Sequence, residues 1–417
     1  MSEKKMPKIR FPEFTGDWEQ RKLGEISDSY SGGTPTAGKA EYYGGSIPFI
    51  RSAEVNSDTT ELFLTDEGLK NSSAKMVKKG DILYALYGAT SGEVGLARLD
   101  GAINQAILDI KPHKDYDAPF LMQWLRKSKE NITGTYLQGG QGNLSGTIVT
   151  SLMIDCPNYD EQKKIGVFFA NLDNLITLHQ RKCEKIKEYK KGCLQKMFPK
   201  EEESIPEVRF SGFTGDWEQR KFAEVFDWLQ NNTLSRAELN YEGGIVKNVH
   251  YGDVLIKFGD YIDASETELP YISDDTKVER FKNSFLHDGD IIIADTAEDD
   301  TVGKCTEIQG SEGIKLLSGL HTIACRPKEK YGAKYMGYYI NSPAYHNQLK
   351  PLMQGIKVTS ISKSALQDTD LLIPKSIDEQ GKIGDFFSDI DCLIALHQRE
   401  CDKYKELKKG LLQQMFV

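Results

Sequence analysis

Histidine and cysteine stand four residues apart at two places, a spacing that puts both side chains on one face of a helix. The pairs are His179 with Cys183 and His397 with Cys401. Two histidines and two cysteines could ligate zinc if the two helices paired in register. Alternatively, they lie in a seam between paired helices, where isolated polar residues fix the register. We expect the seam and predict no metal site.

Two patterns of carboxylates fall short of an active site. Glu161-Gln162-Lys163 contains part of a nuclease motif, but the related stretch at 379–381 has Gly381 in place of the lysine. Residues 295–300 could hold Mg²⁺ or Ca²⁺ through carboxylate oxygens, although we favour an acidic surface turn. The sequence has no G-x-x-x-x-G-K-[ST], G-x-S-x-G or H-E-x-x-H motif and no Pro-Pro pair. We therefore predict that the chain is not an enzyme and binds no cofactor itself.

A glycine-rich tract without charge, GGQGNLSG, covers residues 139–146. It is either a flexible surface loop or a neutral polar loop that reads DNA. In the second interpretation, side-chain amides at Gln138, Gln141 and Asn143 would pair with base edges. Local groups of this kind matter because the net charge of −9 gives no general attraction to phosphate.

Composition indicates a folded protein of two or three domains. The 417 residues are 28% charged and 39% hydrophobic, which is typical of globular rather than disordered chains. We expect no membrane span and no signal peptide, because no long apolar run occurs. The seven cysteines contain no C-x-x-C pair, which suits free thiols and a cytoplasmic location.

Two repeats organise the chain. The long one, at 160–198, returns at 378–416 with about two-thirds of its positions identical. The short one, PKIRFPEFTGDWEQRKLGEI at 7–26, returns at 206–225. Each pair of repeats brackets a block that differs between the halves, although both blocks contain a Gly-Asp-Ile strand start at 80–82 and 289–291. This order predicts a tandem duplication that carries two different blocks of one fold.

The long repeat has the pattern of a helix. Acidic residues near its start suit the helix dipole, and Pro199 ends the first copy. Apolar and special polar residues then alternate at spacings of three and four, which predicts a seam of Ile176, His179, Cys183, Ile186, Ile394, His397, Cys401 and Tyr404. Upstream residues are out of phase with this seam, so we expect a kink or turn at 171–173. The helix after that point would be ~40 Å long, about one turn of duplex DNA.

These features predict an α+β protein with two blocks of mixed sheet and short helices. Two long, coiled-coil-like helices would accompany them in a pseudo-two-fold duplication. The expected segments are a short repeat with the first domain, the first long helix, a linker with the second short repeat and second domain, and the second long helix; they span 1–159, 160–198, 199–377 and 378–417.

The repeated sequences resemble the specificity subunit of type I restriction–modification enzymes along nearly the whole chain. FTGDWEQRKL at 14–23, its copy at 213–222, EQKKIGVFFANLDNLI at 161–176 and KKGLLQQMF at 408–416 carry the likeness. Within the blocks, GDILYALYGATSG at 80–92 and NQA at 104–106 are similar to one type of target-recognition domain. NVHYGD at 248–253 and GLHTI at 319–323 are similar to another.

The resemblance implies two target-recognition domains separated by two long antiparallel helices. It implies a DNA-binding subunit without catalysis, which reads one part of a bipartite, asymmetric target with each domain. It also implies two methyltransferase subunits, which bind S-adenosylmethionine, and two ATP-dependent restriction subunits; Mg²⁺ is expected there rather than on this chain. From residue type we predict contacts to double-stranded DNA by two sets of side chains. These are Thr34, Lys39, Tyr42, Arg51, Tyr87, Thr90, Gln138, Gln141 and Asn143 in the first domain, and Arg236, Lys247, Asn248, His250, Tyr251, Lys357, Thr359 and Ser360 in the second.

A different class of function fits the same duplication. The chain could be a protein-interaction adaptor whose repeated helices bridge two identical partners without DNA. Sequence-specific binding to DNA separates the two hypotheses.

Overall fold

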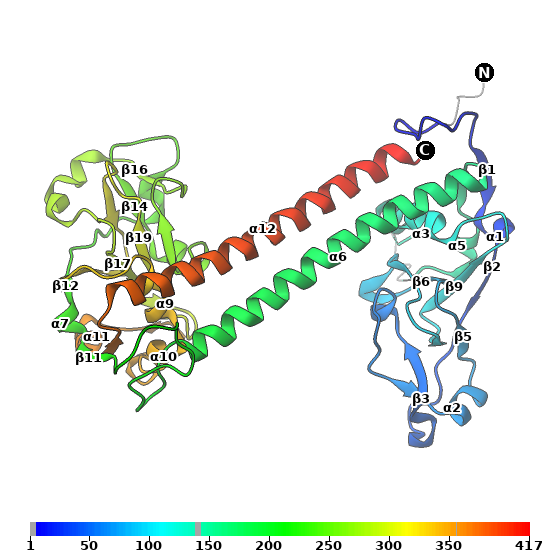
Figure 1. The fold of residues 1–417 in the computed structure, drawn as a ribbon. Coiled ribbons are helices and arrows are strands. Elements are labelled where there is room, and N and C mark those ends of the chain that lie inside the picture. The colour runs from blue at the N-terminus through cyan, green and yellow to red at the C-terminus, as the bar shows by residue number, and fades with distance from the viewer. Residues whose placement is uncertain (1–5, 138–142, 356) are drawn as a thin grey trace. The chain divides into compact units, whose positions relative to one another are not determined.

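A computed structural model describes residues 6–137, 143–355 and 357–417 of the protein. The chain divides into two compact units, and each is described by itself. Unit 1 contains residues up to Gln180 together with Gln398–Val417, and unit 2 contains Arg181–His397. Both units combine sheets with helices (Figure 1), which confirms the mixed α and β class expected from the sequence.

Unit 1 has ten strands and five short helices within its described residues. The strands are β1 Glu19–Lys22, β2 Ser27–Ser31, β3 Tyr43–Ile50, β4 Phe63–Leu64, β5 Lys75–Val77, β6 Ile82–Ala85, β7 Val94–Leu96, β8 Gly101–Ile103, β9 Ile107–Pro112 and β10 Met153–Cys156. The helices are α1 Leu23–Ile26, α2 Asp66–Lys70, α3 Ala118–Lys127, α4 Lys129–Tyr136 and α5 Gly146–Thr150. They form sheets in the orders β2-β9-β6-β7, β4-β3-β8-β5 and β1-β10.

Unit 2 has thirteen strands and five short helices within its described residues. The strands are β11 Glu218–Lys221, β12 Phe226–Trp228, β13 Leu239–Asn240, β14 Lys247–Val249, β15 Tyr261–Asp263, β16 Tyr271–Ile272, β17 Ile291–Ala294, β18 Thr296–Ala297, β19 Cys305–Gln309, β20 Leu316–Ser318, β21 Thr322–Pro327, β22 Thr359–Ser360 and β23 Asp370–Ile373. The helices are α7 Phe222–Val225, α8 Tyr251–Ile256, α9 Tyr335–Asn341, α10 Pro343–His346 and α11 Lys363–Gln367.

The sheets of unit 2 correspond to those of unit 1. The order β12-β21-β17-β19 matches β2-β9-β6-β7, with β15 added at one edge, and β11-β23 matches β1-β10. Central strands β6 and β17 are buried along their whole length, which explains their continuous apolar sequences. Gly80 and Gly289 precede these strands with φ of +98° and +88°. At both positions the turn needs a backbone conformation that glycine adopts without strain.

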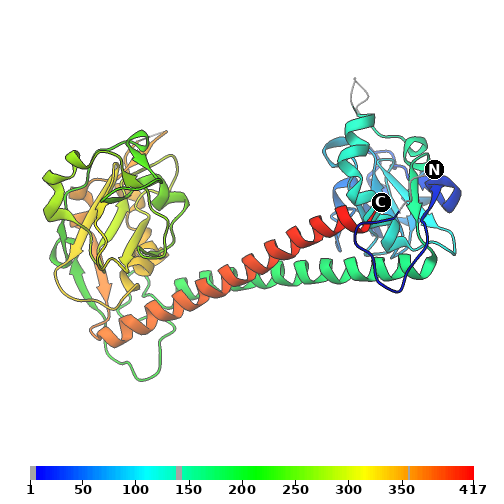
Figure 2. The ribbon, with the colours of Figure 1, turned by 90° about the horizontal axis from the view of Figure 1, so that it is seen from above.

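The long repeats form α6 Tyr159–Lys196 and α12 Ile377–Met415. Figure 2 shows both as unbroken coils. The expected turn at 171–173 is therefore wrong. The change of phase instead marks a change of packing partner, because Ile165, Phe169 and Leu172 belong to the core of the first domain, whereas later residues face the other long helix. One straight helix can present different faces to two neighbours without a break.

The phenylalanine that follows each long helix is buried in a hydrophobic core formed by the other half of the sequence. Phe198, after α6, packs within unit 2 against Trp217, Tyr339 and Phe387, with ring centroids 5.4–6.3 Å apart. Phe416, after α12, packs within unit 1 on Trp18, Phe120 and Phe169 at 5.2–6.3 Å; the set of rings is equivalent. The aromatic anchors of both short repeats thus receive the end of a long helix.

A buried arginine–glutamate pair fastens each short repeat to the start of the long helix of its own half. In unit 1, Arg10 Nε and Nη2 donate to the two carboxylate oxygens of Glu161 at 2.7 Å each. In unit 2, Arg209 makes the same two bonds to Glu379 at 2.6 and 2.8 Å. Bidentate pairing satisfies both carboxylate oxygens and makes burial of the charge tolerable. Glu161 is therefore a structural residue here, not part of a nuclease site.

A second ion pair, between the two long helices, is also repeated. Lys408 Nζ lies 2.6 Å from Asp173 in unit 1, and Lys190 Nζ lies 2.8 Å from Asp391 in unit 2. Together with a second contact in each unit, Cys401 with Ile176 and Cys183 with Ile394, these pairs show that the segments of α6 and α12 run antiparallel within each unit. Burial would raise the pKa of Asp173, but the charges of Lys408 and Arg126 and the hydrogen bonds from Lys408 and Gln123 together outweigh it and lower that pKa.

Each aspartate also accepts a hydrogen bond from the α+β domain of its own half. Gln123 Nε2 on α3 donates to Asp173 at 2.9 Å, and Tyr338 Oη on α9 donates to Asp391 at 2.7 Å. The donors differ, whereas the aspartate and lysine are the same in both repeats. Two unlike domains can thereby be held on one type of helix pair.

We expect Phe416→Ala to destabilise unit 1 by about 3–5 kcal/mol, because it empties a buried aromatic site. Phe198→Ala should do the same to unit 2. Hydrogen exchange resolved along the sequence measures each unit separately. Leu407→Ala is the control, since that side chain is exposed and should change little. Equal loosening of both units by Phe416→Ala would contradict this assignment.

Asp173→Asn should lower the free energy of unfolding of unit 1 by about 1–2 kcal/mol at pH 7, a modest value because the carboxylate is partly exposed. The folded-state pKa of Asp173 is depressed, so its stabilising effect is present above its unfolded-state pKa of about 4. The effect is lost as pH falls through the lower folded-state pKa. Denaturation followed from pH 7 to pH 3 should show wild type and variant converging at the acidic end.

Candidate nucleic-acid interface

Equivalent loops of the two domains bring together many of the predicted DNA-contacting residues. One loop follows the central strand β6 or β17. A second joins β8 to β9 in unit 1 and β20 to β21 in unit 2. A third segment, at Asn143 in unit 1 and Ser360 in unit 2, pairs through its backbone with Tyr87 or Thr296, which lies two residues after the central strand. Because the strands are buried and paired, their rigid ends fix the position of the exposed loops.

In the first domain this arrangement joins Thr34, Tyr87 and Asn143 around Gln105. Thr34 Oγ1 donates to Gln105 Oε1 at 2.5 Å, and the Tyr87 hydroxyl donates to the Gln105 carbonyl. Tyr87 and Asn143 form an antiparallel bridge. Thr90 ends the helical turn that directly follows Tyr87. The cluster is partly to fully exposed and combines hydroxyl and amide groups, which suit base edges better than phosphates.

Other residues predicted in the first domain lie apart from this cluster. Lys39 Nζ pairs with the Tyr42 hydroxyl at 3.0 Å, and the Tyr42 ring is buried. The Arg51 guanidinium lies 2.8 Å from Glu54 and 2.7 Å from Glu61, so two carboxylates already offset its charge. Gln138 and Gln141 fall outside the described residues.

In the second domain, tilted and edge-on ring contacts join His250 and Tyr251 to a residue that we had not predicted, His321. Ring centroids are 4.7 Å apart for His250 and Tyr251 and 5.3 Å for Tyr251 and His321. Arg236 borders the group and makes a bidentate pair with Asp253 at 2.8 and 2.9 Å. Burial, with the nearby Arg236 guanidinium, lowers the pKa of His250. Its ring is therefore neutral near pH 7.

A short two-stranded sheet completes this surface. Thr296 in β18 pairs with Ser360 in β22, as Tyr87 pairs with Asn143 in the first domain. Thr359 Oγ1 donates to the Asp299 carbonyl at 2.9 Å, and Lys357, just before β22, is exposed. The backbone N–H of Ile361 donates to the Asp295 carbonyl at 2.9 Å. Residues separated by more than sixty positions thus form one face.

Two predicted residues of the second domain have structural contacts instead. Asn248 is completely buried and its Oδ1 accepts from Asn232 Nδ2 at 2.6 Å. Its burial argues against direct contact with DNA. Lys247 is partly buried, and its Nζ donates to the Ala264 carbonyl at 3.3 Å. Type alone could not separate such residues from surface residues, because their burial depends on distant strands.

Gln105 and His321 are the central residues that our residue-by-residue reasoning missed. Each lies in the turn between two short strands, and each is exposed. Their place in the sequence offers one signal, an exposed polar residue directly before a buried strand. That signal is common, and only the pairing of distant strands shows which such turns meet the other loops.

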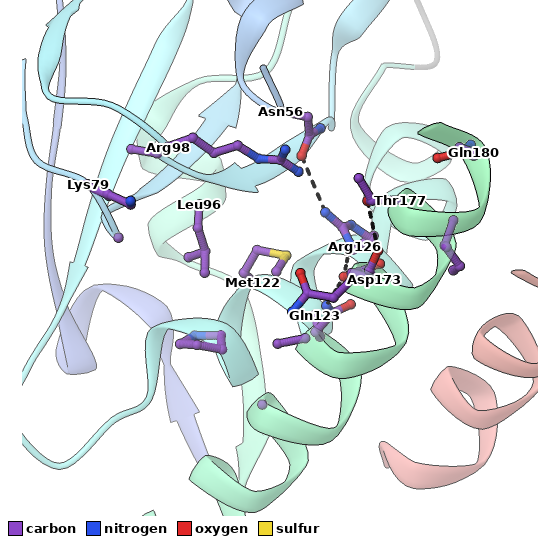
Figure 3. A pocket seen from close by; sticks show the side chains of 17 residues that line it. Asn56, Lys79, Leu96, Arg98, Met122, Gln123, Arg126, Asp173, Thr177 and Gln180 are labelled. Atoms are coloured by element: carbon purple, nitrogen blue, oxygen red, sulfur yellow. Dashed lines mark hydrogen bonds and ion pairs between the residues drawn. The ribbon is translucent and has the colours of Figure 1, made fainter. Parts of the chain in front are cut away.

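A cavity of ≈470 Å³ lies beside the helix α3 in unit 1, away from the predicted contacts. Figure 3 shows Arg126 reaching across it from α3 toward Asp173 on α6 and toward Asn56. Lys79 and Arg98 also line it. None of the predicted DNA-contacting residues does so. We attribute the polar groups here to holding the domain on α6.

The seam residues lie at the junction of the long helices within each unit. In unit 1, Cys401 Sγ is 4.0 Å from the Ile176 carbonyl and the His179 ring lies 5.6 Å from that of Tyr404. In unit 2, Cys183 Sγ is 4.0 Å from the Ile394 carbonyl. The other seam residues, Ile186 and His397, are partly buried.

Among the described residues, no group of three or more His, Cys, Asp and Glu side chains is placed to hold a metal ion. Asp299, in the acidic segment, accepts from the N–H and the hydroxyl of Thr301, as in an ordinary turn. The same described ranges contain no helix with the length and apolar character needed to cross a membrane.

Comparison with known proteins identifies the duplicated architecture. A family model described as the type I restriction modification DNA specificity domain matches twice, at residues 15–188 and 214–406. The MjaVIII type I restriction enzyme specificity subunit of Methanocaldococcus jannaschii is 22% identical over 420 residues, covering 98% of this chain and 93% of that protein.

Solved structures share the fold. The crystal structure of a type I restriction–modification S subunit from M. genitalium aligns with a TM-score of 0.61 and 16% identity, covering 99% of both chains. A chain from a study of complex assembly and conformational transition of the type I R-M system aligns with a TM-score of 0.51 and 17% identity. That alignment covers 96% of this chain and 97% of the other.

We expect Asn248→Ala to lower the stability of the second domain by about 1–3 kcal/mol, because it leaves a buried amide hydrogen of Asn232 unpaired. Ser360→Ala, in an exposed position, is the matched control and should leave the thermal midpoint unchanged. Calorimetry distinguishes the two. An unaltered midpoint for Asn248→Ala would show that the buried pair is not structural.

Proposed function

Because the chain belongs to the family of type I restriction–modification DNA specificity proteins, we propose that it reads a bipartite, asymmetric DNA target with one domain for each half. The observation that carries this proposal is the repetition of one frame beneath two different surfaces. The family model matches both halves, and the Arg–Glu and Asp–Lys pairs recur in both. The two clusters carry different side chains at equivalent positions: Gln105 and Asn143 in the first domain, and His321 and Ser360 in the second.

Different surfaces on equivalent loops support different base preferences. The first domain offers hydroxyl and amide groups of Thr34, Tyr87, Gln105 and Asn143. The second offers imidazole and phenol rings with the hydroxyls of the paired strands β18 and β22. Such groups form hydrogen bonds with base edges and discriminate between base pairs by about 1–3 kcal/mol each. Two unlike domains would read different sequences in the two halves of the target, whereas a dimer of identical subunits reads a palindrome.

The proposal includes partner subunits that perform the chemistry. Two methyltransferase subunits would bind the repeated helices and supply S-adenosylmethionine, and two restriction subunits would supply ATP hydrolysis with Mg²⁺. Near-identical long repeats favour two copies of one partner on this chain. The net charge of −9 supports the same view, since basic partners would provide the phosphate contacts that an acidic chain lacks. This chain would itself catalyse nothing.

The test is sequence-specific methylation by the reconstituted complex of this chain with its methyltransferase partner. Sequencing that reports methylated positions should reveal one bipartite, asymmetric site. We expect Asn143→Ala to relax one half of that site by ~1–3 kcal/mol and Ser360→Ala to relax the other. These two residues occupy equivalent bridges, so each variant is the control for the other.

Three results would contradict the proposal. A complex that binds and methylates DNA without sequence preference would remove the reading role. Specific capture of a non-DNA partner by the isolated chain, with no DNA dependence in the complex, would favour the adaptor function. Relaxation of the same half by both variants would refute the assignment of one domain to each half.

A further inference from the structure

His321 has an unfavourable backbone conformation at the tip of the turn between β20 and β21. Its φ is +54°, in the left-handed region that side chains other than glycine adopt only at a cost. The corresponding turn in the first domain, 104–106, contains no positive φ. A turn of this kind would form more easily with glycine. Retention of a strained residue beside a binding surface indicates a role for its side chain.

Asp295 and Tyr251 lie beside the His321 ring. Asp295 Oδ1 lies 3.4 Å from Nδ1, and the Tyr251 ring packs against it edge-on at 5.3 Å. Asp295 is itself positioned, because Thr296 Oγ1 donates to the same carboxylate at 2.7 Å. The Asp295 N–H also donates to the His321 carbonyl at 3.1 Å. Asp295 therefore contacts both the backbone and the side chain of His321.

The free edge of the ring is available to a ligand. About half of the His321 side chain is exposed, and Nε2 has no hydrogen-bond partner among the described residues. A carboxylate near Nδ1 favours the tautomer with its hydrogen on that nitrogen. Nε2 then carries a lone pair and accepts a hydrogen bond. In the major groove, the amino groups of adenine and cytosine are the donors that complement it.

We propose that His321 is a specificity-determining residue of the second domain, which accepts a hydrogen bond from the amino group of an adenine or cytosine through Nε2. Asp295 is the positioning residue that orients the ring. This inference rests on the proposed function, since it assigns one base contact within the same DNA-reading surface. It adds a residue, its hydrogen-bonding polarity and the class of base that it selects.

The test uses the full chain in its complex with the methyltransferase partner. Binding is measured by competition among DNA targets in which every base pair of both halves is replaced in turn. At one position of one strand, wild type should bind targets with adenine or cytosine at least about fivefold more tightly than targets with thymine or guanine. His321→Gly should remove that preference and leave every other position unchanged. Its thermal midpoint should stay equal or rise, because glycine adopts the left-handed backbone freely.

Asp295→Asn provides a second variant that leaves the His321 side chain and backbone in place. It should weaken the preference at the same base pair as His321→Gly. The double variant should show no further loss there. Relaxation at a different base pair, or additive losses, would overturn the positioning role of Asp295.

The alternatives give distinct results. If wild type shows no sequence preference at all, the proposed function itself fails. If wild type reads its target and His321→Gly reads it equally well, only this inference fails. If His321→Gly weakens binding equally for all DNA sequences and reduces the salt dependence of the affinity, His321 contacts a phosphate. A lowered thermal midpoint with a general loss of binding would make it a structural residue.

Discussion

The fold depends on the insertion of each long helix into an aromatic site that the other half of the sequence constructs. Phe416 and Phe198 are almost fully buried, and each fills a site formed by a tryptophan of a short repeat and a phenylalanine of a long one. Burial of an aromatic side chain is worth several kcal/mol. The repeats therefore cannot diverge as freely as the surfaces do, because every change at these sites affects a core.

Repetition made the frame predictable from the sequence. Long helices, two α+β blocks and the central strands after Gly80 and Gly289 follow from periodicity, glycine placement and internal identity. The turn at 171–173 was wrong because a change of phase shows that the packing partner changes, and it does not require the helix to break. Asp173, at that point, bonds to Lys408 and to the recognition domain at once.

The interface was harder to predict, because residue type reports chemistry but not exposure. Asn248 has a suitable amide and is buried between strands, whereas His321 was overlooked in a turn. Arg51 has a suitable charge but is paired with two glutamates. Each outcome depends on which distant strands lie side by side, and local sequence contains little information about that pairing. Where predicted residues did meet, as Tyr87 and Asn143 do, Tyr87 belonged to a segment with a clear strand signal, whereas Asn143 stood in a glycine-rich tract without one.

The position of Phe416 bears on the order in which the protein can fold during synthesis. Unit 2 is one continuous stretch of chain, whereas unit 1 needs both its early residues and Gln398–Val417. A ribosome that releases the chain from its N-terminus therefore exposes the first domain with an open aromatic site long before the helix that fills it exists. The second domain, although made later, can close its core first. Until then the Trp18 site is an apolar surface that chaperones would bind and other chains could occupy.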